Sequence, residues 1–125
     1  MSKGGLIVCV SGGRDFEDIE ALFSVLDDIH AMSGIASVLH GDCPTGADRF
    51  AKLWCREREV NEIAIKADWN KYDDKERSNP AGILRNQTLI EHGFDLLVAF
   101  PTDGPGTKDM IQRAKRNGIP YRVFG

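Results

Sequence analysis

The stretch VAFPTDGPGTKDM, residues 98–110, joins a strand-like apolar run to a helix-like segment. Strand-to-helix connections of this kind decide the fold. The apolar run ends at Pro101, a loop with Gly104 and Gly106 follows, and Thr107 precedes the helical pattern. Two explanations of the glycines compete. They permit a tight turn, with a positive φ at Gly106, or they leave space for a phosphate at the N-terminus of the helix. Thr107 then either caps the helix or donates its hydroxyl.

The same alternation continues along the whole chain. Strands that alternate with helices indicate right-handed crossovers and a parallel sheet covered on both faces. We therefore predict an α/β protein, a Rossmann-like three-layer sandwich of about five parallel strands in the order 3-2-1-4-5. The predicted strands are residues 6–10, 35–39, 62–66, 94–100 and 121–124, and the predicted helices are residues 16–30, a segment from Ala47, a segment opened by Pro80, and residues 107–117.

Length and composition bound the possible functions. The 125 residues suit a single domain over residues 1–125, and no apolar run has the length of a transmembrane helix. No signal peptide is recognisable at the start, so a cytoplasmic location is expected. A net charge of −3 argues against nucleic acid as a partner. The three cysteines form no CxxC pair, so we expect no metal site, and no cofactor motif is present.

The predicted topology places three loops at one edge of the sheet. Ligands of open α/β sheets bind beyond the carboxyl ends of the strands, where the strand order reverses. Here that position lies between the first and fourth strands, beside the loops 11–16 and 101–107, with the loop 41–46 next to them. All three loops contain glycine, which favours the phosphate explanation over the tight turn.

Each further candidate has an ordinary alternative. Arg14 suits a bidentate contact with phosphate, although isolated loop arginines are usually solvated. Gly41 and Gly46 have the spacing of a Walker loop, but Ala47 and Asp48 replace its Lys and Ser/Thr, which leaves a second anion nest or a simple helix cap at Thr45. Other residues stay open between a ligand role and a structural one: Trp69 and Tyr72 in the long polar stretch 68–79, a candidate lid, and the helical pair Arg85 and Asn86. His40 adjoins the site, and the sequence shows no acid or nucleophile to pair with it.

Several motifs together resemble the YspA-like branch of the SLOG superfamily. They are SGGRDF (residues 11–16), HGDCPTGADRFAKLWC (residues 40–55), AGILRNQTLI (residues 81–90) and AFPTDGPGTKDMIQRAKRNGIPYRVF (residues 99–124). This superfamily has a Rossmann-like fold and includes the LOG phosphoribohydrolases. The resemblance implies a nucleotide or nucleotide-derived ligand and a homodimer, and many small members are bacterial or phage-encoded.

The resemblance also assigns roles to individual positions. Gly104, Gly106 and Thr107 match the end of the PGGxGTxxE signature, which holds phosphate in the LOG enzymes and supplies their catalytic Glu. Met110 stands at the Glu position, so N-glycosidic hydrolysis by the family mechanism lacks its carboxylate. Asp42, Asp48 and Asp103 are possible substitutes. Arg85 matches the family arginine and is the candidate catalytic residue.

The predicted function is binding of a nucleotide or nucleotide-derived phosphate ligand, with no membrane involved. One alternative is a phosphoribohydrolase that acts on a nucleoside monophosphate, and another is a protein-interaction module with a vestigial pocket. The predicted ligand-binding residues are Gly13, Arg14, Asp15, Gly41, Asp42, Thr45, Gly46, Trp69, Arg85, Asn86, Gly104, Gly106 and Thr107.

Overall fold

A parallel five-stranded sheet in the order β3-β2-β1-β4-β5 organises the computed structural model, which describes residues 5–67 and 81–124. Every pair of neighbouring strands is parallel, so each connection must cross over one face of the sheet. The predicted strand order is therefore confirmed. The strands are β1 (Leu6–Gly12), β2 (Ile35–His40), β3 (Asn61–Ala64), β4 (Leu96–Phe100) and β5 (Tyr121–Val123).

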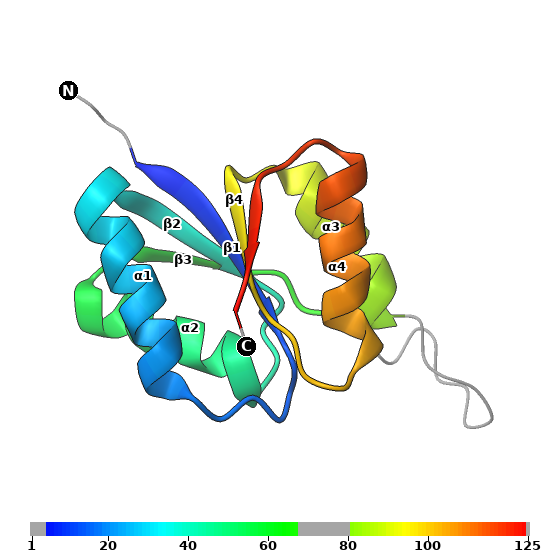
Figure 1. Cartoon of the computed structure of the whole chain (residues 1–125), viewed down its shortest axis with the longest axis horizontal. Helices are drawn as coiled ribbons and strands as arrows, with labels where there is room; N and C mark the ends of the chain where they lie inside the picture. Colours follow the sequence, from blue (N-terminus) through cyan, green and yellow to red (C-terminus); the bar gives the residue numbers. More distant parts are fainter. Residues whose placement is uncertain (1–4, 68–80, 125) are drawn as a thin grey trace.

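Two pairs of helices cover the two faces of the sheet, as Figure 1 shows. Side chains alternate along β1, so Val8 and Val10 belong to the core on one face and Cys9 to the core on the other. The three-layer sandwich is confirmed. The first face carries α1 (Ile19–Ser33) and α2 (Gly46–Arg58), and the second carries α3 (Ala81–His92) and α4 (Pro105–Arg116).

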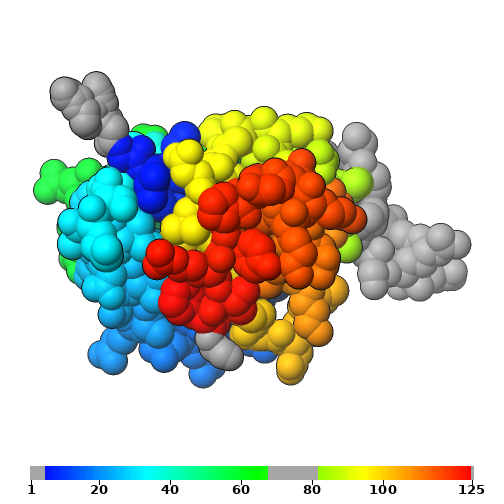
Figure 2. All heavy atoms as spheres, turned by 45° about the horizontal axis from the view of Figure 1, so that its top comes forward, coloured from blue at the N-terminus to red at the C-terminus, as the bar shows by residue number. Residues whose placement is uncertain are grey.

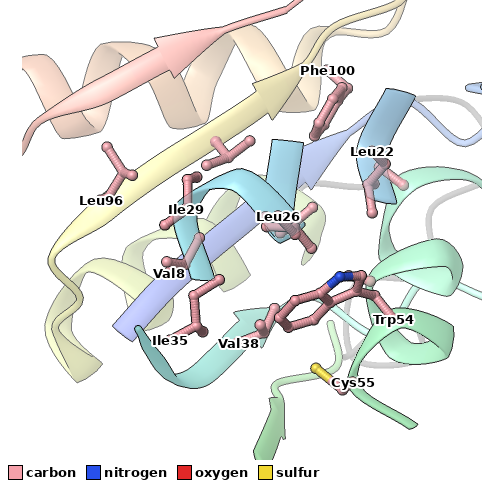
Figure 3. Packing of buried hydrophobic residues seen from close by; sticks show 14 residues of the cluster. Val8, Leu22, Leu26, Ile29, Ile35, Val38, Trp54, Cys55, Leu96 and Phe100 are labelled. Carbon is pink, nitrogen blue, oxygen red and sulfur yellow. The ribbon is translucent and has the colours of Figure 1, made fainter. Parts of the chain in front are cut away.

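Trp54 links α2 to α1 within the core on the first face of the sheet, which we call the first core. The core on the other face is the second core. Its side chain is fully buried, and its indole extends toward Val38 of β2 (Figure 3). The indole N–H donates to Asp27 Oδ1 of α1 over 2.8 Å. Arg58 donates to the same carboxylate from Nε, at 2.8 Å, and from Nη2, at 2.9 Å. The hydrogen bond from Arg58, with that from Trp54, holds the pKa of Asp27 below its ordinary value.

Three helices begin at other residues than the periodicity predicted, and α2 differs least, since it begins at Gly46 rather than Ala47. α1 begins at Ile19 rather than Phe16, because Asp18 accepts the Ala21 N–H at 3.0 Å and so caps the helix. α4 begins at Pro105, with Gly104 as its N-cap, because the fixed φ of proline suits the first helical position. The expectation that Thr107 caps this helix is wrong, since Thr107 lies inside the first turn.

Residues 121–124 comprise the edge strand β5, which lies beside β4, and the residue after it. Figure 2 shows them between α1 and α4. The Phe124 ring stacks on that of Phe100 with 5.6 Å between their centroids, which ties the residue after β5 to the first core. Within the described residues, no helix combines the length and apolar character that crossing a bilayer requires.

We expect Asp27→Ala to lower the free energy of unfolding in urea by about 1–3 kcal/mol, because the buried Trp54 N–H loses its acceptor. A depressed folded-state pKa means that this carboxylate stabilises the fold above its ordinary pKa near 3.8. That stability is lost as the pH falls through the lower, folded-state pKa. The variant should therefore lose less stability on acidification than the wild type.

The neighbouring Asp28→Ala serves as the control. Asp28 lies on the same helix and is exposed, and its substitution by alanine removes an equal charge. Equal destabilisation by the two substitutions would show that Trp54 does not depend on Asp27.

Candidate functional site

A pocket of about 790 Å³ opens at the carboxyl edge of the sheet, where β1, β2 and β4 end. The loops that follow β1 and β4 lie together at this edge (Figure 1). Ten of the predicted site residues line it: Gly13, Arg14, Asp15, Gly41, Asp42, Arg85, Asn86, Gly104, Gly106 and Thr107. A smaller hollow of about 150 Å³, between α1 and Phe124, contains none of them.

The glycines at the start of α4 face open space. A Cβ added at Gly104 or Gly106 would meet no atom within 4 Å, and neither residue has a positive φ. The positive φ expected at Gly106 is therefore wrong, and neither position requires glycine for the turn. Both residues line the pocket, so the backbone at the start of α4 is accessible from it.

Gly41 and Gly46 are needed for a different reason. A Cβ at Gly41 would lie 1.9 Å from Arg85 Nη1, so only glycine admits that guanidinium. Gly46 has a φ of +75° and lies against the loop after β1, where a Cβ would come within 2.1 Å of the Gly13 carbonyl oxygen. Gly46 is not among the pocket-lining residues, and neither is Thr45, whose side chain makes no capping hydrogen bond at the start of α2.

Arg85 and Asn86 link two of the loops. Arg85 donates from Nη1 to the Gly41 carbonyl at 2.8 Å and from Nε to Asn86 Oδ1 at 3.3 Å. Asn86 is 2% exposed, and its Nδ2 donates to the Gly106 carbonyl and to Asp109 Oδ2, each at 3.0 Å. Both polar atoms of the Asn86 amide thus have protein partners. Asn86 is therefore suited to positioning the start of α4.

Asp48 is a lining residue that the sequence raised only as a possible substitute for the missing Glu. It is 6% exposed, and its carboxylate accepts the backbone N–H groups of Cys43, at 3.2 Å, and Gly41. Burial raises its pKa, and the neighbouring His40 and Arg85 side chains oppose that shift. The signal in the sequence was an acid in the first turn of a helix, from which side chains reach back to preceding N–H groups. The carboxylate occupies part of the proposed second anion nest.

His40 has the partner that the sequence did not reveal. Its Nδ1 accepts the Asp42 N–H at 2.9 Å, so Nε2 carries the proton and donates to Glu62 Oε2 at 2.6 Å. Asp42 has a φ of +56°, and its carboxylate pairs with Lys52 Nζ at 3.0 Å. The buried His40 thus holds the strained backbone of a lining residue in place.

Some of the predicted features lie outside the described residues. They are Trp69 and Tyr72, the candidate lid 68–79 and Pro80. Within residues 5–67 and 81–124, no three His, Cys, Asp or Glu side chains gather in a way that could hold a metal ion.

Comparisons with known sequences agree with the motifs. Residues 6–72 match the model of a family described as YAcAr: YspA, cpYpsA-related SLOG family. Gene 61 protein of Mycobacterium phage D29 is 28% identical over 120 residues, which cover 94% of this chain and 95% of that protein. A phage protein is thus among the relatives of this chain.

A solved structure shares the fold. The crystal structure of E. coli tRNA N6-threonylcarbamoyladenosine dehydratase, TcdA, matches 94% of this chain with a TM-score of 0.54 and 13% identity. The chain spans about half of that protein, since the match covers 50% of its length. At this identity the likeness bears on the fold, and it supports the parallel α/β architecture.

The three cysteines should differ in reactivity. Cys43 is partly exposed and lines the pocket, whereas Cys9 and Cys55 are buried. Burial raises the pKa of Cys55 to about 12 and also raises that of Cys9, so few thiolates form at either. We expect iodoacetamide to modify one thiol quickly in the folded protein, and intact-mass spectrometry should show a single addition. Cys43→Ser should abolish that addition, and rapid double labelling of the folded protein would contradict the assignment.

Proposed function

The chain belongs to the YspA, cpYpsA-related SLOG family, and we propose that its pocket binds a nucleotide or nucleotide-derived ligand with a phosphate at the N-terminus of α4. Family membership supports a nucleotide-related function. The observation that carries the finer proposal is the open space at Gly104 and Gly106, where backbone geometry does not require glycine. The volume of about 790 Å³ lies within the range of pockets that bind small molecules.

The start of α4 supplies the chemistry for an anion. Backbone N–H groups in the first turn of a helix lack intrahelical partners, and the helix dipole favours negative charge there. Asn86 holds the Gly106 carbonyl, which fixes the direction of these N–H groups. Arg14 lines the same pocket, and the planar guanidinium of arginine matches phosphate geometry.

Met110 supports binding over hydrolysis. It is fully buried in the second core, with Leu89 and Leu97, and is not among the residues that line the pocket. A thioether neither accepts a proton at neutral pH nor stabilises a cationic sugar. We therefore expect no multiple-turnover release of free base from AMP, GMP, CMP or UMP, measured by liquid chromatography. Sustained release would make the protein a phosphoribohydrolase.

Gly106→Ala tests the phosphate position directly. Alanine is the better helix former, so the free energy of unfolding should stay equal or rise by up to about 1 kcal/mol. The added methyl group occupies pocket space, so the affinity for nucleoside monophosphates should fall at least about tenfold, or about 1.4 kcal/mol. Calorimetry with AMP, GMP, CMP and UMP measures the affinity, and urea unfolding measures the stability.

Ser24→Ala is the matched control. It makes a similar change of helix propensity on an exposed position of α1, away from the pocket, and should leave affinity unchanged. An unchanged affinity in Gly106→Ala would show that the phosphate does not bind at the start of α4. A wild-type protein that binds none of the four nucleotides would favour the interaction-module alternative.

A further inference from the structure

We propose that Asp48 accepts hydrogen bonds from the sugar hydroxyls of the ligand, so that the sugar lies toward the loop after β2 and the phosphate toward α4. This inference rests on the proposed function and deepens it, because it names the carboxylate that would recognise the ribose hydroxyls. Asp48 lines the pocket from the first turn of α2, and the start of α4 lines the same pocket.

A chain of hydrogen bonds separates Asp48 from the phosphate end. The Gly106 carbonyl accepts from Asn86, Asn86 accepts from Arg85, and Arg85 donates to the Gly41 carbonyl. The N–H of Gly41 then donates to Asp48. The two termini of this chain are thus the helix start that favours an anion and a carboxylate that repels one. A ligand that carries a phosphate at one end and neutral donors beyond it matches this order.

The carboxylate of Asp48 keeps acceptor capacity for a ligand. An ionised carboxylate offers about four lone-pair positions, and the two backbone N–H groups use two of them. A phosphate has no proton to donate when fully ionised, whereas each sugar hydroxyl donates one. Carboxylates that bind ribose hydroxyls are established in dinucleotide-binding α/β folds. The same chemistry is available here from a different element of the fold.

Among the carboxylates that line the pocket, Asp48 is the best placed for this role. Asp42 already pairs with Lys52 at 3.0 Å, and Asp15 is exposed on its loop. Asp48 is 6% exposed, so a hydroxyl bound to it is shielded from competing water. Its burial raises its pKa and makes the ionised form costly, which His40 and Arg85 partly offset.

The test compares nucleotides with and without sugar hydroxyls. Calorimetry measures the affinities of AMP and UMP and of their 2′,3′-dideoxy counterparts for the wild type, Asp48→Asn and Asp28→Asn. We expect the wild type and Asp28→Asn to prefer the ribonucleotides by about tenfold or more. In Asp48→Asn this preference should disappear, while inorganic phosphate binds equally well or better because a negative charge is lost. A purely structural role would weaken all four nucleotides alike and leave the ratio unchanged.

The possible failures can be told apart. If neither nucleotides nor inorganic phosphate bind the wild type, the proposed function itself is wrong. If nucleotides bind but their dideoxy forms bind as tightly, the phosphate site stands and the role of Asp48 is overturned. A preference that persists in Asp48→Asn also overturns it. Should Asp48→Asn not fold, Asp48→Ser replaces it, because its hydroxyl can still accept a backbone N–H.

Discussion

The guanidinium of Arg85 rests on the bare backbone of Gly41, and the arrangement of the pocket depends on this contact. A side chain at Gly41 would occupy the position of the guanidinium, so the pair is compatible only with glycine. From there Arg85 reaches Asn86, and Asn86 reaches the first turn of α4. A loop after β2 and a helix start after β4 are therefore held in one network, although about 65 residues separate them in the sequence.

Glycines at this edge of the sheet perform two different tasks. Gly41 and Gly46 allow backbone and side chains to approach closely, which brings the loops together. Gly104 and Gly106 leave space unfilled on the pocket wall while their backbone is ordinary. The first pair brings the loops together, and the second leaves the start of α4 uncovered on the pocket wall. A motif that only counts glycines does not distinguish the two.

The pocket also has a chemical polarity. Its α4 side offers backbone N–H groups and the helix dipole, and the α2 side offers the buried carboxylate of Asp48. Arg85 lies between them and moderates the cost of the buried charge. Met110 packs into the second core and is not among the residues that line the pocket. This polarity supports the proposal that the pocket orients a phosphorylated ligand.

The sequence by itself determined the α/β class, the strand order, the edge of the sheet where the loops meet, and ten of the residues around the pocket. These follow from local periodicity and from the topological rules of parallel sheets. It did not determine the start of α4, because proline at the first helical position and the glycine cap outweighed the apolar pattern. Nor did it pair His40 with Glu62, or reveal that Asp48 holds the N–H of Gly41. Only the tertiary structure decided these points, because hydrogen bonds between side chains and distant backbone depend on how adjacent strands and loops pack.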